Sequence, residues 1–153
     1  MPSPAKAAKT PELNASDAHT WNRLLLLHAH VESRLATVLQ RRHGLGLSEY
    51  RALGFLVEAE KNELRMTELA DRLGLNQSSV TRLVHRLNTA EFTYRDLCPD
   101  DKRGAYTVLT DAGRDRYREA RTTYDATLTA ALDDLAAADP GHAAIVEAAR
   151  GVA

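Results

Sequence analysis

The residues most capable of binding chemistry lie between positions 77 and 86, where polar and apolar side chains recur at the spacing of an α-helix. The apolar set is expected to face a core: Val80, Leu83, Val84 and Leu87. The outward set carries hydrogen-bond donors and acceptors: Gln77, Ser78, Ser79, Thr81, Arg82, His85 and Arg86. No acidic residue occurs from position 76 to position 90. Such a helix suits the major groove of DNA, where base edges present donors and acceptors.

Two arginines on this helix have complementary uses. Arg82 and Arg86 are one helical turn apart, so both point the same way. One is expected to bind guanine O6 and N7 while the other contacts phosphate. Ser79 and Thr81 lie near the start of the helix, where backbone N–H groups and the helix dipole also favour phosphate. The alternative is that both arginines are surface residues paired with acids.

The preceding segment predicts the rest of a helix-turn-helix. A short helix is expected over about 68–73, capped by Thr67. Ala70 is small enough for close packing, and Gly74 fits the turn. Asn76 is expected to cap the second helix, which runs to about position 90, through its side-chain oxygen.

The periodicity then changes to that of strands. Residues 92–97 and 105–109 read as two short strands joined by a polar tip rich in turn-forming residues. A charged hairpin placed directly after a DNA-reading helix predicts a wing.

Two long helices flank this region. The first is expected from Ser16, as cap, to about Arg42, with the stripe Trp21, Leu24, His28, Val31, Leu35, Val38 and Leu39. The run 24–27 is apolar throughout, which predicts burial on two sides, one against the chain's own domain and one against a partner subunit. The second long helix is expected over about 111–137, capped by Thr110.

Shorter elements complete the prediction. Gly44 and Gly46 are expected to end the first helix. Ser48 then caps a helix over about 49–60, and residues 61–65 read as a polar loop. A last short helix is expected to start at Asp139-Pro140, with Asp as N-cap and Pro in the first turn.

The bulk composition predicts one mainly helical domain of 153 residues with a sizeable core. No apolar run is long enough to span a membrane, no signal core is present, and the single cysteine fits a reducing cytosol. The net charge is −1, but residues 72–103 hold six Lys/Arg against four Asp/Glu, whereas residues 111–153 hold five Arg against eight acids. The positive part therefore coincides with the predicted DNA-reading segment.

In this order of elements the chain resembles the MarR family of transcription regulators. The likeness is carried by three segments: residues 66–70 (MTELA), residues 79–87 (SVTRLVHRL), and DDKRG at 100–104 followed by VLTDAG at 108–113. The resemblance implies a homodimer with one winged helix-turn-helix per subunit on a pseudo-palindromic operator. It divides the chain into a disordered tail (1–15), an N-terminal dimerisation helix (16–47), a DNA-binding lobe (48–110) and C-terminal helices completing the dimer body (111–153).

The likeness also assigns the wing. Asp101 and Arg103 match the family's Asp-x-Arg pattern, in which the carboxylate pre-orients the guanidinium for a narrow minor groove. Lys102 would add a phosphate contact, and Gly104 would relieve the turn. One departure is Glu91, which stands where the family usually has a glycine and removes an easy left-handed helix stop.

A ligand pocket is also implied, because the family binds small aromatic or anionic effectors between the dimer body and the DNA-binding lobe. The residues expected to line it are Trp21, His28, Arg51 and Tyr117. Trp and Tyr would stack on a ring and Arg would hold a carboxylate. The alternative is that Trp21 and Tyr117 are dimer-core residues.

Other chemistries have weaker support. His28, His30 and His43 form no compact ligand set for zinc, so no metal or cofactor is expected. Cys98 lies near Arg95 and Arg103 in sequence, which leaves a redox-responsive regulator open. No nucleophile–base–acid set or phosphate-binding glycine loop indicates an enzyme.

The leading hypothesis is thus a dimeric repressor of neighbouring genes, released by a small effector. The alternatives are a regulator or activator that needs no effector, and a winged helix used to bind protein.

Overall fold

The computed structural model describes residues 15–97 and 104–151, and the predicted tail over residues 1–15 lies almost entirely outside them. The helices are α1 (Ala15–His43), α2 (Leu47–Glu58), α3 (Met66–Leu73), α4 (Gln77–Thr89), α5 (Asp111–Ala138) and α6 (Pro140–Arg150). A 3-10 turn, η1, covers Glu60–Asn62, and the strands are β1 (Glu63–Arg65), β2 (Thr93–Asp96) and β3 (Tyr106–Leu109). The predicted mainly helical class is confirmed.

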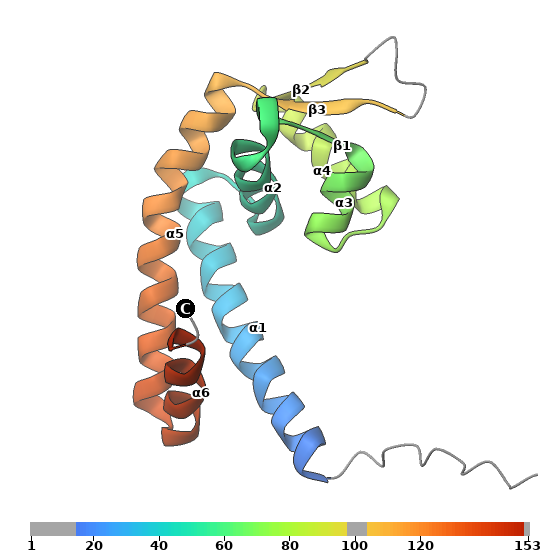
Figure 1. Cartoon of the computed structure of the whole chain (residues 1–153). Coiled ribbons are helices and arrows are strands. Elements are labelled where there is room, and N and C mark those ends of the chain that lie inside the picture. The colour runs from blue at the N-terminus through green and yellow to red at the C-terminus, as the bar shows by residue number, and fades with distance from the viewer. Residues whose placement is uncertain (1–14, 98–103, 152–153) are drawn as a thin grey trace, which may run out of the picture.

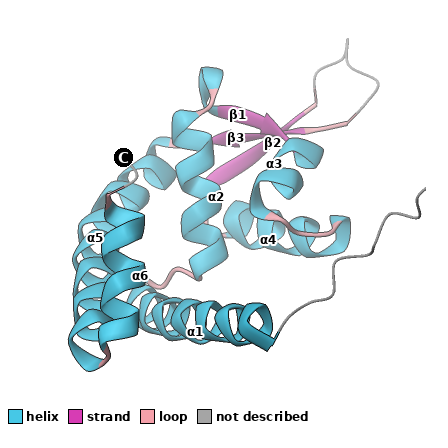
Figure 2. Cartoon of the chain, turned by 60° about the horizontal axis from the view of Figure 1, so that its bottom comes forward, coloured by secondary structure: helices cyan, strands magenta, loops and turns pink. Residues whose placement is uncertain are grey.

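The long helices and the small elements occupy different parts of the molecule. Helices α1 and α5 pack along each other, and α6 folds back against α5 (Figure 1). Helices α2, α3 and α4 form a lobe at one end, with the three strands lying together beside them (Figure 2). We call α1, α5 and α6 the body and the remaining elements the lobe.

One apolar core joins the lobe to the adjoining ends of α1 and α5. Most of its fully buried side chains come from α1, α2, α3 and α4, and they include Leu39, Leu53, Leu56, Leu69, Val80, Leu83 and Leu87; Ala120 of α5 is also fully buried there. Val80, Leu83, Val84 and Leu87 are all buried, so the predicted orientation of α4 is confirmed. Because α4 buries this stripe, its polar residues necessarily face outward.

Three predicted caps are confirmed. The side chain of Asn76 accepts a hydrogen bond from Ser79 N at 2.9 Å. Thr110 Oγ1 accepts from Gly113 N at 3.0 Å, and Asp139 caps α6 with Pro140 in the first turn. Each of these side-chain oxygens satisfies an N–H group that the first turn of a helix leaves unpaired.

Three other predicted caps are wrong, because Ser16, Ser48 and Thr67 each lie inside the first turn of their helix. In α2 the carboxylate of Glu49 accepts from Gly46 N at 3.2 Å. In α3 the carboxylate of Glu68 accepts from Arg65 N at 3.0 Å. In both helices the residue before the first turn is thus Gly46 or Arg65, and the glutamate at the third helical position, rather than a hydroxyl, satisfies an N–H group there.

The polar loop predicted over residues 61–65 is also wrong. It consists of the end of η1 followed by strand β1, which pairs antiparallel with β3 so that Leu64 lies opposite Thr107. The sheet order is β1-β3-β2. A three-residue strand has too little alternation to be recognised alone, and its partner lies more than forty residues away.

The two predicted wing strands are confirmed, although β2 and β3 are each slightly shorter than expected. They pair antiparallel, with Arg95 opposite Thr107.

Helix α4 ends in a left-handed stop despite the missing glycine. Glu91 has φ +62°, its N–H donates to Asn88 O, and Phe92 N donates to Leu87 O, both at 3.0 Å. This pair of bonds is the Schellman arrangement that normally selects glycine. Thr110 Oγ1 also donates to the Glu91 carbonyl at 2.7 Å, which helps hold the strained residue in place.

Replacing Glu91 with glycine is therefore expected to stabilise the fold. The left-handed conformation costs a non-glycine residue about 1–2 kcal/mol, and the greater freedom of glycine in the unfolded chain returns part of this. We expect a net gain of about 0.5–1 kcal/mol in the free energy of unfolding, measured by urea denaturation. Glu91→Ala, which keeps the strain, serves as the control, and an equal gain in both variants would contradict this explanation.

Candidate nucleic-acid interface

The outward face of α4 is polar and accessible. Of the seven contact residues predicted on this helix, six are exposed and Ser79 is half-buried; the exposed ones are Gln77, Ser78, Thr81, Arg82, His85 and Arg86. The structure therefore brings the seven residues predicted on α4 onto one surface. Their contacts with DNA remain a prediction.

Part of this hydrogen-bonding capacity is used within the helix. Ser78 Oγ donates to Asn76 Oδ1 at 2.9 Å, and Thr81 Oγ1 donates to Gln77 O at 2.8 Å. Ser79 N is bound by the Asn76 cap. The hydroxyl oxygens of Ser78 and Thr81 keep acceptor capacity, whereas the Ser79 amide is already occupied.

The two arginines differ in their surroundings. Arg86 Nε donates to Glu49 Oε1 of α2 at 2.9 Å. Arg82 makes no hydrogen bond or ion pair with any described residue. Among the described residues, the alternative that the arginines pair with acids thus holds for Arg86 and not for Arg82.

A recess of about 270 Å³ lies between α4 and the sheet. It is lined by Met66, Gln77, Thr81, Val84, His85, Asn88, Arg95 and Thr107. Arg95 brings a guanidinium from β2 to the polar face of α4, and we add it to the candidate contacts. The alternation of side chains along a strand could have predicted this position. Arg95 shares a face of β2 with Thr93, whose hydroxyl donates to Asn88 Oδ1 of α4 at 2.6 Å.

The tip of the wing falls largely outside the described residues. Asp101, Lys102 and Arg103 lie there, as does Cys98. Gly104 is described and has φ +133°, a backbone conformation that L side chains rarely adopt. This conformation agrees with the prediction that Gly104 relieves the turn.

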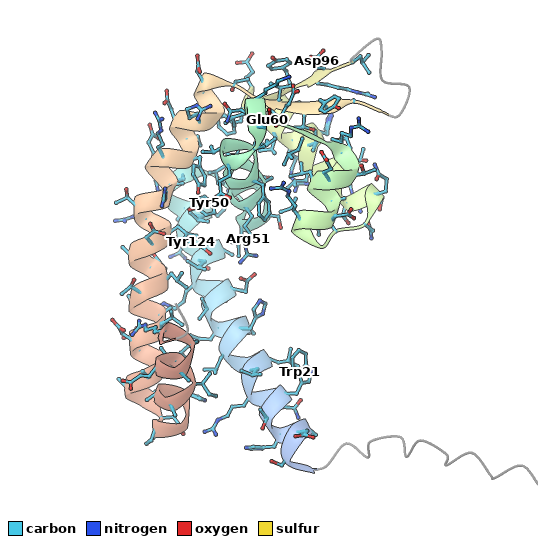
Figure 3. All side chains as sticks on the ribbon, viewed as in Figure 1. Trp21, Tyr50, Arg51, Glu60, Asp96 and Tyr124 are labelled. Atoms are coloured by element: carbon cyan, nitrogen blue, oxygen red, sulfur yellow. The ribbon has the colours of Figure 1, made fainter. Side chains whose placement is uncertain are left out.

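A second site lies where α2 meets α5. Arg51 and Tyr117 line a cavity of about 270 Å³ together with Tyr50, Gly54, Phe55, Glu58, Arg121, Tyr124 and Asp125. The Tyr50 ring stacks between two others, with centroids 5.1 Å from Tyr117 and 4.5 Å from Tyr124. Figure 3 shows Tyr50, Arg51 and Tyr124 close together, with Trp21 far along α1.

The guanidinium of Arg51 at this site is already paired. Both terminal nitrogens of Arg51 donate to the carboxylate of Glu32 on α1. These bonds lower the pKa of Glu32 below its ordinary value. Burial, and the neighbouring Tyr117, raise the pKa of the Tyr50 phenol well above its usual range, so it is neutral at physiological pH.

The four residues predicted for a ligand pocket do not all line one cavity. Arg51 and Tyr117 share the cavity described above. His28 lines an apolar groove between α1 and the C-terminal helices, although its Nε2 lies 3.8 Å from Glu32 Oε1, an oxygen that Arg51 also binds. The Trp21 side chain is 60% exposed on α1. The exposure of Trp21 in the single chain agrees with the alternative that this residue belongs to a dimer interface.

Two further properties of the described residues bear on function. None of the helices in this part of the chain is both long and apolar enough to cross a membrane. Residues 15–97 and 104–151 contain no group of three His, Cys, Asp or Glu side chains arranged to hold a metal ion.

A helix-turn-helix whose second helix presents a polar, acid-free face, backed by an antiparallel hairpin, defines the winged-helix class of DNA-binding proteins. Within that class, the chain belongs to the MarR family. The family model described as MarR family matches residues 43–104. Sco3205, a MarR family transcriptional regulator from Streptomyces coelicolor solved in complex with DNA, is 30% identical over 83% of this chain and 80% of its own, with a TM-score of 0.76.

Other solved structures agree with this assignment. AbsC, a MarR family transcriptional regulator from Streptomyces coelicolor, is 26% identical over 93% of this chain and 99% of its own, with a TM-score of 0.72. CouR from Rhodococcus jostii RHA1, solved with bound p-coumaroyl-CoA, shares the fold at 24% identity over 76% of this chain and 79% of its own, with a TM-score of 0.64. No curated protein sequence matches the chain.

Proposed function

We propose that this MarR family regulator is a homodimer that binds a pseudo-palindromic operator, represses neighbouring genes and leaves DNA when a small effector binds. The observation that carries the proposal is the exposed face of α4, which has no acid and holds Arg82 without an intrachain partner among the described residues. Sco3205, which shares this fold, was crystallised with DNA.

In this proposal α4 lies in the major groove. Arg82, Arg86 and the polar residues of the helix reach base edges or phosphates. Arg95, which lines the recess, contacts the DNA backbone. Asp101, Lys102 and Arg103 would extend the contact into the minor groove.

The direct test is binding to the DNA immediately upstream of the protein's own coding sequence, titrated against salt. We expect a preference over random DNA, and a binding constant that falls with salt at a slope of about −0.9 for each phosphate neutralised. Binding without sequence preference would contradict autoregulation.

The exposed apolar surface of the body supports dimerisation. Helix α1 exposes Trp21, Leu24, Leu25 and Leu26, and Leu26 is 71% exposed. An apolar groove of about 440 Å³ lies beside them, lined by residues of α1, α5 and α6 that include Leu27, Leu132 and Val146. Apolar surface of this extent is a common mark of a protein–protein interface.

Replacing Leu26 with glutamate is expected to weaken the dimer. In a two-fold interface the substitution places two carboxylates in apolar surroundings, so we expect the dimer dissociation constant to rise by about tenfold or more. Sedimentation velocity over a concentration series measures this change. Leu97→Glu adds the same charge at an exposed leucine outside the body. If both variants stay dimeric at the same concentrations, this surface is not the interface.

The effector site is proposed at the tyrosine cavity between α2 and α5. Stacked rings and a guanidinium suit a planar aromatic anion. CouR, with a related fold, binds p-coumaroyl-CoA. An effector held there would lower DNA affinity only by binding more tightly to a dimer whose α4 helices are wrongly spaced for successive grooves.

The ion pair of Arg51 predicts a test of this site. Glu32 accepts hydrogen bonds from the Arg51 guanidinium that an anionic ligand would need. With salicylate as a probe for a planar aromatic anion, Glu32→Gln is therefore expected to tighten binding by roughly threefold to tenfold. Arg51→Met is expected to abolish binding. Isothermal titration with salicylate measures both variants, and an unchanged affinity in Glu32→Gln would place any anion elsewhere.

A further inference from the structure

The contact between Glu49 and Arg86 joins α2, which precedes the helix-turn-helix, to α4, the second helix of that motif. Glu49 lies in the first turn of α2, and its side chain is 16% exposed. Arg86 lies near the end of α4, and its side chain is 57% exposed. The carboxylate is therefore mostly shielded by protein, whereas the guanidinium reaches the surface proposed to meet DNA.

Both oxygens of this carboxylate have partners. Glu49 Oε2 accepts from Gly46 N at 3.2 Å, and Oε1 accepts from Arg86 Nε at 2.9 Å. The first bond ties the carboxylate to backbone at the start of α2, so it offers Arg86 a fixed acceptor. A charge-assisted hydrogen bond to a fixed acceptor restricts the rotamers of a long side chain.

The bond leaves the recognition end of Arg86 available. It uses Nε, and neither terminal nitrogen has a partner among the described residues. Nη1 and Nη2 are two coplanar donors, as bidentate recognition of guanine O6 and N7 requires. An arginine held in this way meets the groove with its geometry already set.

We propose that Glu49 is a positioning residue for base recognition: it holds Arg86 by Nε so that the two terminal nitrogens face the DNA. The inference rests on the proposed DNA contact of α4. It assigns to α2 a part in sequence preference, although Glu49 itself is mostly shielded and has both oxygens bonded within the protein. The opposite arrangement, in which Glu49 withholds Arg86 from DNA, predicts that removing the charge strengthens binding to every sequence.

Glu49→Gln separates the two tasks of this side chain. Glutamine also serves at the third position of a capping box, so the bond to Gly46 N is kept while the negative charge that faces Arg86 is lost. Glu68→Gln is the matched control, because Glu68 makes the same cap in α3 with Arg65 N and does not contact Arg86. Both variants remove one negative charge, so any gain in DNA affinity that comes only from net charge is expected in both.

The measurement is the preference of each full-length variant across a random-sequence duplex pool, with thermal melting as a check on folding. We expect Glu49→Gln to lose about tenfold in preference at one base position per half-site, and Glu68→Gln to keep the wild-type preference. In an Arg86→Ala background, which has lost that preference already, Glu49→Gln is expected to have no further effect.

Two results would overturn the inference, and they are distinguishable. If Arg86→Ala loses the preference and Glu49→Gln retains it, or binds all sequences more tightly with the preference intact, then Glu49 does not position Arg86 and the proposed DNA contact stands. If Arg86→Ala selects the same sequences as the wild type, then the proposed contact of Arg86 fails together with the inference.

Discussion

Replacing Arg82 with alanine is expected to lower affinity for the preferred duplex by about 5- to 150-fold, which corresponds to the 1–3 kcal/mol of one bidentate base contact. Arg82 is exposed on α4 and makes no hydrogen bond or ion pair with any described residue. Its removal therefore breaks no intrachain interaction seen in the described structure, and the loss reports the DNA contact. Fluorescence anisotropy with the preferred duplex and a random one measures the affinity and the discrimination.

The same experiment decides what Arg82 recognises. If it reads a base, discrimination falls and the salt dependence changes little; if it binds phosphate, both duplexes weaken equally and the salt slope falls by about one. Arg118→Ala is the control, because it removes the same charge from an exposed position on α5, outside the interface. Equal losses in both variants would mean that only net charge matters.

Replacing Gly113 with alanine is expected to destabilise the fold by about 3 kcal/mol, at the upper end of the usual cost of overpacking. A Cβ atom at this position would lie 2.2 Å from Phe92 O and 3.0 Å from Leu109 Cδ1. The Phe92 carbonyl has little freedom to move, because it accepts from Thr110 N at 3.0 Å. The start of α5 would have to shift away from the base of the wing. Urea denaturation measures the change.

Gly141→Ala is the matched control for this prediction. Gly141 also lies in the first turn of a helix, but its added Cβ would meet the guanidinium of Arg23, the far end of a flexible side chain. We expect a change of at most about 1 kcal/mol, in either direction, since alanine is also the better helix former. A similar loss in both variants would show that helix-start glycine as such, rather than the contact with Phe92, is responsible.

Local patterns were enough to predict much of this protein. The helical spacing of Val80, Leu83, Val84 and Leu87 set the buried side of α4, and so also its exposed polar face. The caps at Asn76, Thr110 and Asp139 were predicted because each bond joins residues two or three positions apart. The family motifs then added the winged-helix architecture, which the structure and the comparison with Sco3205 confirm.

Other features depend on residues that are distant in the sequence. Strand β1 exists because β3 pairs with it, and a three-residue segment carries no signal of that pairing. The predicted ligand residues do not share one cavity. Helix α1 carries Trp21 far from Arg51, and His28 lines the apolar groove and approaches Arg51 only through the Glu32 carboxylate that both contact.

The same limit applies to single side chains. Nothing local distinguishes Arg82 from Arg86, yet only Arg86 meets the carboxylate of Glu49, which α2 brings across the lobe. The sequence places Gly113 within a family motif but does not show that Phe92 O leaves no room for a side chain there. The sequence by itself determined which faces are apolar and where most elements lie, because hydrophobic spacing and most capping bonds act within a few residues. Packing decided which side chains meet, because hydrogen bonds and steric contacts depend on positions set by the whole chain.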